Sequence, residues 1–499
     1  MTEKERIISD ASKYTAAVYL AQVLAVITAI VMRKYLGPYL MGVVAALMVV
    51  FTYAWYAQAG IIQAVERELP FFYGQGNDDR AALVRDTGFT ISLIVGVGAM
   101  LAVWAVAFFL KDSLPPVVVF GLVVYGFAAL INQVTQFYGI ALRARKEFGL
   151  ISKARAIFSL VGTLGNAAVV ILFSIYGLYL LFPLLILAEL AYLYWNTRYS
   201  FAIKIKLSEV KRLLVIGLPI FVGGLGFDTL RNVDKMVIIG FLGAEALGFY
   251  SIALMVHNYI YFIPNVFSMV MYPRFQESYG AFGSIERLKA YVIVPTQALS
   301  GLLPILLGGF YIGVPFLVRH VLPQYTEGID SLKILIIGTF FLGLHHMPAQ
   351  FLLTINKQLK SMPIGWVAAG AGFVLGKAFI DFGWGINGVA ISAVISYALF
   401  YILIMGYALS HLSTFRETVG VLLHVFMSLL YSMVILLLVD RLSPSAGVDI
   451  VSDMRITSMQ LILFGVASIP MVLYIDRKTG VLTTIFGMLK PRVAFLTGK

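Results

Sequence analysis

Long apolar stretches follow one another along almost the whole chain and are separated by short polar segments. A helix needs about 20 apolar residues to cross the hydrocarbon core of a bilayer, and most of the stretches have that length. They are continuous runs and do not alternate, so the pattern predicts helices and excludes the strands of a membrane β-barrel. We expect about 14 transmembrane helices, near 14–33, 39–64, 87–110, 116–141, 152–174, 177–196, 213–238, 246–271, 288–316, 331–354, 362–381, 386–409, 417–439 and 456–475.

The composition agrees with an all-α integral membrane protein, since 60% of the residues are hydrophobic and 12% are charged. No polar segment between the stretches is long enough to fold as a soluble domain. The first stretch ends in Arg33 and Lys34 without a small-residue cleavage site, which predicts a retained helix and not a signal peptide. The chain has no cysteine, which excludes disulfides, thiolate zinc sites and cysteine nucleophiles.

The positions of Lys and Arg predict the orientation, because the cytoplasmic loops of membrane proteins retain positive charge. If the N-terminus is cytoplasmic, most of the 37 basic residues fall in inside segments, with the densest groups at 143–155, 198–212 and 477–499. We therefore expect both termini inside, an even number of spans, and localisation in the inner or plasma membrane. The net charge of +12 fits loops that face anionic lipid, so we expect membrane lipid and no nucleic acid as a partner.

An internal repeat divides the chain. Tyr35-Leu36-Gly37 recurs as Phe241-Leu242-Gly243, and Tyr176-Gly177-Leu178 recurs as Trp384-Gly385-Ile386 at nearly the same spacing. Chance occurrence in a chain with 45 glycines is the alternative. The repeat predicts two pseudo-symmetric six-helix bundles around an axis along the membrane normal, as in many transporters. The expected parts are an N-terminal lobe (1–200), a C-terminal lobe (201–411), and two extra helices with a basic tail (412–499).

Four charged residues lie in the seventh predicted span, which is unusual because a charge at the centre of a membrane helix costs about 2.5–3.5 kcal/mol. They are Asp228, Arg231, Asp234 and Lys235. In one continuous helix, residues 228, 231 and 235 share a face. One interpretation is that this face lines a central cavity, where Arg231 and Lys235 bind an anionic group, with Arg231 the leading candidate because of the forked hydrogen bonds of a guanidinium. The alternative is a salt bridge between Asp228 and Arg231, with Asp234 and Lys235 at the outer membrane interface.

Other polar residues within spans are weaker candidates. Lys377 and Asp381 are spaced i, i+4, which fits either a structural ion pair or an ion site. Glu189 lacks an obvious partner in the sequence and either carries protons or stays neutral in the bundle. His257 and the pair His345-His346 line the cavity or are buried and hydrogen-bonded.

Several classes of chemistry find no support in the sequence. A Walker loop is missing, which argues against direct use of ATP. No histidines show metal-ligand spacing, and no large outer loop carries the paired acids that a membrane glycosyltransferase needs. We therefore expect neither an enzyme nor a cofactor or metal, and transport driven by an ion gradient, the membrane potential or the substrate gradient.

The segment from 213 to 280 resembles the start of the second half of the polysaccharide flippases. The similar motifs are Gly217-Leu218-Pro219, Asn232–Met236, Phe241–Ser251 and Tyr272-Pro273-Arg274, with weaker similarity at Tyr35-Leu36-Gly37 and Trp384–Ala390. These flippases are the O-antigen or teichoic-acid translocase type of the multidrug/oligosaccharidyl-lipid/polysaccharide exporter superfamily. With the number of spans, the resemblance covers essentially the whole chain.

The resemblance implies a flippase that moves a polyprenyl-diphosphate-linked oligosaccharide from the cytoplasmic to the outer leaflet by alternating access. It also implies two bundles that form a V, with the first, second, seventh and eighth spans around a cationic cavity. The family's aspartate–basic pair matches Asp234 and Lys235. The resemblance leaves open Na⁺ or H⁺ as coupling ions and glycan polymerases or transferases as partners.

Three other functions stay open. A multidrug or cation antiporter of the same superfamily would favour acidic residues in an apolar cavity, and Arg231 argues against cationic drugs. A peptidoglycan-precursor flippase would carry several basic residues in the early spans, where only Arg33 and Lys34 fit. A membrane glycosyltransferase or ligase would need the catalytic outer loop that the chain lacks.

Overall fold

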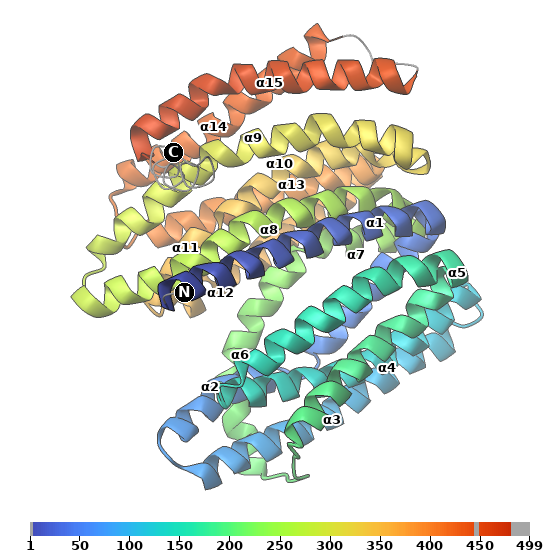
Figure 1. Cartoon of the computed structure of the whole chain (residues 1–499), viewed down its shortest axis with the longest axis vertical. Helices are drawn as coiled ribbons and strands as arrows, with labels where there is room; N and C mark the ends of the chain where they lie inside the picture. Colours follow the sequence, from blue (N-terminus) through green and yellow to red (C-terminus); the bar gives the residue numbers. More distant parts are fainter. Residues whose placement is uncertain (1–2, 444–448, 481–499) are drawn as a thin grey trace. The chain divides into compact units, whose positions relative to one another are not determined.

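The computed structural model describes residues 3–443 and 449–480, which form helices and contain no strand (Figure 1). Lys490, Arg492 and Lys499 of the predicted basic tail lie outside the described residues. The helices are α1 (Glu3–Tyr56), α2 (Ile61–Gly74), α3 (Asp78–Phe109), α4 (Pro116–Ala144), α5 (Phe148–Thr197), α6 (Leu207–Leu230), α7 (Val233–Phe241), α8 (Gly243–Phe282), α9 (Lys289–Val321), α10 (Ile329–Leu344), α11 (His346–Thr354), α12 (Gln358–Asp381), α13 (Gly385–Leu409), α14 (Phe415–Leu442) and α15 (Ile450–Thr479), with 3-10 helices η1 (Glu286–Leu288) and η2 (Pro323–Gly328).

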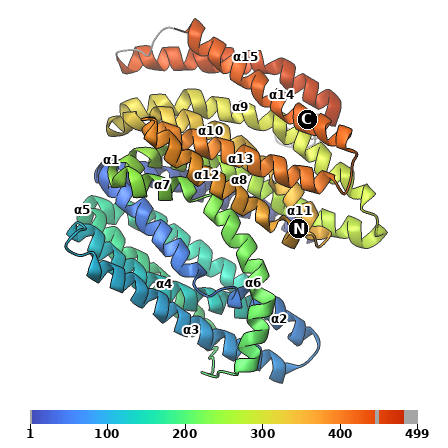
Figure 2. The ribbon, with the colours of Figure 1, turned by 180° about the vertical axis from the view of Figure 1, so that it is seen from behind.

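Twelve helical segments of the described residues are long and apolar enough to cross a membrane. Two of the helices, α1 and α5, each contain a residue with non-helical backbone angles, Gly37 (φ 72°, ψ 174°) and Ser174 (φ 54°, ψ −143°). In α5 the chain folds back there, because a Cβ on Gly177 would lie 2.6 Å from the carbonyl oxygen of Val169. The two arms of α1 also run in different directions (Figures 1 and 2). Each of these helices therefore holds two of the predicted spans, and the all-α integral membrane class is confirmed.

The chain forms two compact units. Unit 1 comprises Met1–Leu225 and Gly243–Gly248, and unit 2 comprises Gly226–Leu242 and the described residues from Phe249 onward. Unit 1 therefore holds α1 to α5, most of α6 and the first turn of α8. The predicted lobe boundaries and the third part at 412–499 stay predictions.

The repeated Leu-Gly motifs touch each other in unit 1. A Cβ on Gly42 would lie 1.7 Å from the carbonyl oxygen of Ala244, and a Cβ on Gly248 would lie 1.8 Å from that of Pro38. The two contacts are reciprocal, since Gly42 and Pro38 of the first motif correspond to Gly248 and Ala244 of the second. Only glycine allows backbones to approach this closely. The reciprocity supports the predicted repeat, because a twofold axis produces contacts in such pairs.

The second predicted span, 39–64, is not one helix. It is interrupted between α1 and α2, where Ala59 (φ 49°) and Gly60 (φ 91°) take left-handed backbone angles. α6 passes directly over this interruption, because a Cβ on Gly217 would lie 1.9 Å from the carbonyl oxygen of Gly60. The close approach explains the Gly217-Leu218-Pro219 motif in terms of packing.

Ion pairs join three of the helices of unit 1. Arg212 of α6 donates to Glu68 of α2 and to Glu209, and Arg80 of α3 lies 2.8 Å from Glu209. The segments before α3 and before α6 therefore meet at the same end of the unit. The positive-inside rule predicts this arrangement, because both segments are expected to be cytoplasmic.

Candidate functional site at a broken helix

The seventh predicted span is broken in the structure. α6 ends at Leu230 and α7 begins at Val233, so the prediction of a continuous helix over 213–238 is wrong at Arg231 and Asn232. The polar side chains around the break supply the missing hydrogen bonds. Asn232 Nδ2 donates to the carbonyl oxygen of Asp228 (2.7 Å), and Lys235 Nζ donates to that of Arg231 (3.2 Å) and to Asn232 Oδ1 (2.7 Å). A break in a membrane helix is tolerated when backbone groups are satisfied in this way.

The break corrects the predicted shared face of residues 228, 231 and 235. Asp228 belongs to α6, Arg231 lies in the break and Lys235 belongs to α7. Because the three residues are not in one helix, their spacing in the sequence does not show that they share a face. The ammonium of Lys235 lies at the carboxyl end of α6, where a cation interacts favourably with the helix dipole. Lys235 therefore stabilises the break itself.

Asp234 fastens α7 to α8. Its side chain is enclosed by protein, with 2% of the residue exposed. Oδ2 accepts a hydrogen bond from the Tyr250 hydroxyl (2.9 Å), and Oδ1 accepts one from the backbone N–H of Lys235 (2.8 Å). Hydrogen bonds to a charged, buried group contribute about 1.5–3 kcal/mol each. Asp234 is thus a structural anchor in this state of the protein.

Arg231 has hydrogen-bonding capacity left. Its guanidinium carbon lies 4.8 Å from the centre of the Tyr261 ring, a cation–π contact. Its Nε is buried and has no hydrogen-bond partner among the described residues. Asp228 is half-buried and lies within electrostatic reach of both Arg231 and Lys235. A buried N–H without an acceptor is costly, so this group is a candidate for ligand binding.

A boundary between two helices lies beside this break. α10 ends at Leu344 and α11 begins at His346, but His345 itself keeps helical backbone angles (φ −65°, ψ −20°), and one candidate membrane span, Pro323–Thr354, covers the predicted span 331–354. The His345 ring lies 4.8 Å from Phe227, near the end of α6, and stacks at 6.2 Å on Tyr261. The His346 ring lies 5.1 Å from Tyr261, and its Nε2 is buried without a partner among the described residues. We call Arg231, Tyr261, His345 and His346 the break cluster.

His257 belongs to the surroundings of the break cluster. Its Nδ1 lies 2.8 Å from the hydroxyl of Thr339, which itself donates to the carbonyl oxygen of Leu335. Because a hydroxyl has one hydrogen, Nδ1 of His257 is the donor in this contact. The interpretation as a buried, hydrogen-bonded histidine therefore describes His257.

The remaining predicted residues lie elsewhere. Lys377 and Asp381 of α12 form an ion pair, with Nζ 2.6 Å from Oδ2, and both side chains are exposed. Glu189 of α5 is half-buried in unit 1, with Arg155 as a nearby cation. The geometry of the Lys377–Asp381 pair agrees with a structural ion pair, and the functional roles of all three residues stay predictions.

Sequence reasoning did not single out Tyr261, Tyr250 or Phe227. One signal was available, since His257 and Tyr261 are spaced i, i+4 and form one stripe of a helix. The aromatic character of that stripe is ordinary in a membrane helix, so it does not by itself indicate a site.

Comparisons with known proteins give a family and a fold. The family model for the polysaccharide biosynthesis protein family matches residues 36–288, just over half of the chain. A structure of the lipid II flippase MurJ in an inward closed conformation superposes with a TM-score of 0.68 at 11% identity, covering 93% of this chain and 99% of the other. A multidrug resistance MATE family transporter of the MOP superfamily, inward-facing, gives a TM-score of 0.60 at 16% identity, covering 80% and 95%. The eukaryotic MATE transporter AtDTX14 gives 0.54 at 14%, covering 84% and 95%. No curated protein matches the chain.

Proposed function

Because this chain belongs to the polysaccharide biosynthesis protein family and has the fold of the MOP superfamily transporters, we propose that it flips a polyprenyl-diphosphate-linked oligosaccharide from the cytoplasmic to the outer leaflet. It is a multi-pass membrane protein of the transporter class. The main observation behind the proposal concerns Nε of Arg231. It is buried at a break within a predicted span and has no hydrogen-bond partner among the described residues.

A diphosphate suits the break cluster chemically. Its oxygens accept hydrogen bonds from a guanidinium in a bidentate manner, and Nε of Arg231 is buried without a partner among the described residues. Nε2 of His346 supplies a further group that lacks a protein partner among the described residues.

Coupling is the second part of the proposal. Asp228 lies close enough to Arg231 to compete with a phosphate for its charge. Binding of Na⁺ or H⁺ at Asp228 would release Arg231 for the substrate, which links the ion gradient to substrate binding. In this proposal both termini face the cytoplasm and the protein resides in the cell membrane.

Two alternatives share the fold. A cation antiporter is disfavoured because Arg231 repels a cationic drug from the break cluster. A peptidoglycan-precursor flippase is expected to hold more cations in the early spans. There, Arg33 is buried and donates from Nη1 to the carbonyl oxygen of Ala29 (3.0 Å) in its own helix.

Substitution of Arg231 tests the proposal. Wild-type protein, Arg231→Ala, Arg231→Lys and the control Arg441→Ala are reconstituted in vesicles with a fluorescent polyprenyl-diphosphate oligosaccharide, and outward movement is measured with a membrane-impermeant lectin. Loss of a charge-assisted hydrogen bond of about 1.5–3 kcal/mol predicts binding about tenfold to about a hundredfold weaker in Arg231→Ala. Arg231→Lys keeps the charge but loses the fork, so it should be intermediate. Wild-type flipping by Arg231→Ala at equal protein level would overturn the assignment.

A further inference from the structure

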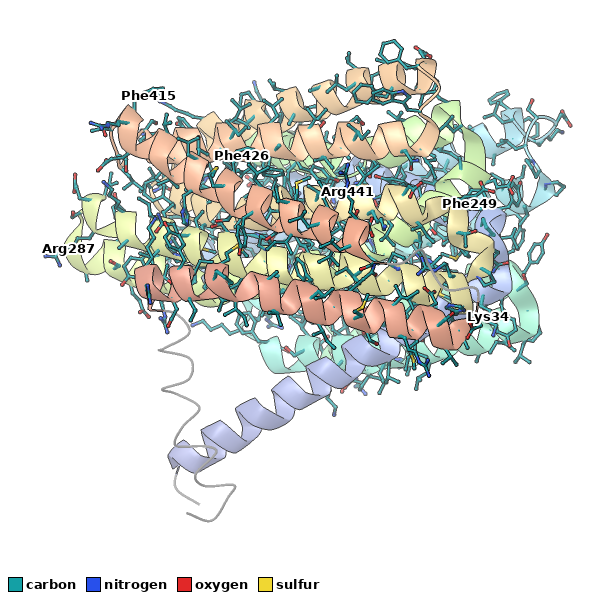
Figure 3. All side chains as sticks on the ribbon, turned by 90° about the horizontal axis from the view of Figure 1, so that it is seen from above. Lys34, Phe249, Arg287, Phe415, Phe426 and Arg441 are labelled. Atoms are coloured by element: carbon teal, nitrogen blue, oxygen red, sulfur yellow. The ribbon has the colours of Figure 1, made fainter. Side chains whose placement is uncertain are left out.

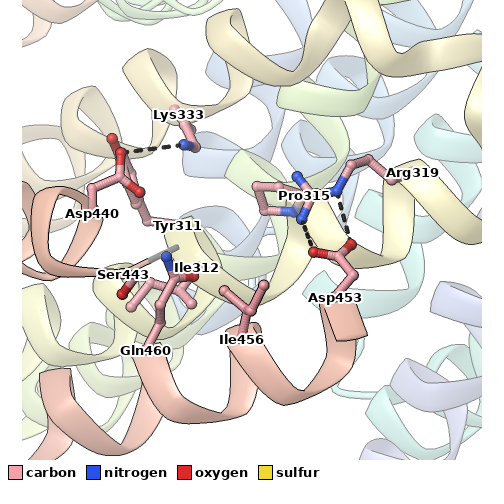
Figure 4. A pocket seen from close by; sticks show the side chains of 10 residues that line it. All are labelled: Tyr311, Ile312, Pro315, Arg319, Lys333, Asp440, Ser443, Asp453, Ile456 and Gln460. Carbon is pink, nitrogen blue, oxygen red and sulfur yellow. Dashed lines mark hydrogen bonds and ion pairs between the residues drawn. The ribbon is translucent and has the colours of Figure 1, made fainter. Parts of the chain in front are cut away.

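Unit 2 contains a second polar site, separate from the break cluster. It lies where α9 and α14 end and where α10 and α15 begin, and it encloses a cavity of about 300 Å³. This volume is at the lower end of the range of about 300–1,000 Å³ for small-molecule sites. The polar residues that line it are Tyr311, Arg319, Lys333, Asp440, Ser443, Asp453 and Gln460 (Figure 4).

On one wall of the cavity, protein groups already form hydrogen bonds with the carboxylate of Asp453. Asp453 of α15 has a side chain that is 1% exposed and accepts hydrogen bonds from Arg319 Nε (2.9 Å) and Nη2 (3.0 Å). Nε2 of His320 lies 2.8 Å from the same carboxylate. These contacts fix α15 against α9 and leave Asp453 and Arg319 little capacity for a ligand.

The opposite wall keeps polar groups that can form hydrogen bonds with a ligand. Lys333 Nζ forms an ion pair with Asp440 Oδ2 at 4.0 Å, beyond the about 3.2 Å limit of a hydrogen bond, and lies 4.8 Å from the centre of the Tyr311 ring. The ammonium and the carboxylate are thus paired by charge but keep hydrogen-bonding groups for a ligand. Within the part of the chain that the structure describes, neither the Tyr311 hydroxyl nor the Gln460 amide makes a hydrogen bond. Donors and acceptors thus converge on one small space (Figure 4).

The charge pattern selects the class of ligand. Two cations and two carboxylates line the cavity, so an anion would meet Asp440 and a cation would meet Lys333. A sugar hydroxyl both donates and accepts, and two neighbouring hydroxyls can bond to Asp440 and Lys333 at once. Ile312, Pro315 and Ile456 offer apolar surface for the C–H face of the ring. We propose that this cavity binds a neutral sugar residue.

The position of the cavity assigns a role to sugar binding, and this step rests on the proposed function. Figure 3 shows Arg287 and Phe415 at one end of unit 2 and Phe249 toward the other. The cavity lies at the end of Phe249, because a Cβ on Gly328, just before α10, would lie 2.2 Å from the carbonyl oxygen of Phe249. With both termini inside, this is the outer end. α14 and α15, the two helices outside the repeat, supply four of the ten lining residues, and Ser443 directly after α14 supplies a fifth, so they equip the outer face to receive the glycan after translocation.

Saturation-transfer NMR on the full chain in nanodiscs tests the proposal, with galactose, mannose and N-acetylglucosamine as probes. The pocket variant Asp440→Asn/Gln460→Ala removes one charged acceptor and one amide, and Glu327→Gln removes a carboxylate at the same end outside the cavity. At least one sugar should give a signal with wild type and with Glu327→Gln. The pocket variant should bind it about tenfold more weakly or not at all, because about 1.4 kcal/mol corresponds to tenfold.

Three results overturn the proposal. They are the absence of a signal for every sugar, an unchanged signal in the pocket variant, and displacement of the sugar by inorganic phosphate, which would indicate an anion site. The lectin assay separates this failure from that of the proposed function. If Arg231→Ala stops flipping while no sugar binds, only the cavity proposal falls. If sugars bind but wild-type protein flips nothing, the flippase proposal falls.

Discussion

A methyl group added at Gly42 tests the reciprocal contact of the two repeated motifs. Its carbon would lie 1.7 Å from the carbonyl oxygen of Ala244, where ordinary contact begins at 3.4 Å. The clash is with backbone, which has no alternative rotamer, so Gly42→Ala must separate the two segments by roughly 1.7 Å. Overpacking of this kind costs about 1–3 kcal/mol of stability. Gly248→Ala should cost a similar amount, because its methyl would meet Pro38 at 1.8 Å.

The double variant gives the sharper result. Both methyl groups push apart the same two segments. Once the first methyl group has separated the segments, the second causes little further clash. The loss of stability in Gly42→Ala/Gly248→Ala should therefore be clearly smaller than the sum of the single losses. Gly98→Ala, a helix position with no heavy atom within 4 Å of the added carbon, is the control and should change stability little.

Because the chain has no cysteine of its own, introduced cysteines can be labelled selectively. Cysteines introduced at the exposed positions Tyr39 and Glu245 carry spin labels, which report the separation of the two segments, and thermal unfolding in detergent reports stability. The separation should widen in each glycine variant and not in Gly98→Ala. Single variants with wild-type separation and stability, or strictly additive losses, would show that the two motifs do not share one contact.

Three further predictions concern the charged residues. Asp228→Asn should flatten the dependence of flipping on Na⁺ or pH in the vesicle assay, and an unchanged dependence would remove Asp228 from coupling. Tyr250→Phe should lower stability by about 1.5–3 kcal/mol, because it removes a hydrogen bond to the buried carboxylate of Asp234; a loss below about 0.5 kcal/mol would contradict the anchoring of α7. Lys377→Met should change stability by less than about 0.5 kcal/mol and leave flipping intact, since its pair with Asp381 is exposed; abolished flipping would favour an ion site.

The fold class was predictable because length and apolarity decide which segments cross a bilayer. The change of direction at Gly37 falls between two predicted spans, and that at Ser174 falls on the last residue of one, so the apolar pattern located both to within a residue or two. The basic segments of unit 1 also meet as the charge bias predicted. In each case a property of the local sequence determines the outcome.

The break at Arg231 was not predictable in the same way. Four charged residues mark this segment in the sequence, but the apolar residues on both sides still add up to one span of membrane length, so the pattern predicts one helix. A membrane helix can break where other groups form hydrogen bonds with the backbone groups that have lost their helical partners, and where side chains fill the space around them. Lys235 and Asn232 form these hydrogen bonds at Arg231, and the ring of Tyr261 lies against the Arg231 guanidinium. Because Arg231 lies in a break and not on a helix face, the spacing in the sequence predicted the wrong geometry around it, and its role stays a prediction.

The predicted repeat relates segments of different chemistry, and this difference bears on the proposed substrate. At the spacing of the repeat, Ala25 of the first predicted span corresponds to Arg231 in the sequence, so the counterpart of the cation is a methyl group. A site for a compact ion would gain from ligands on both sides of a twofold axis. A lipid-linked sugar has one anionic group between an apolar tail and a neutral glycan, so it needs one cationic contact and gains nothing from a second. A cation in one copy of the predicted repeat and not in the other therefore agrees with the proposed amphipathic substrate, which has a single charged centre.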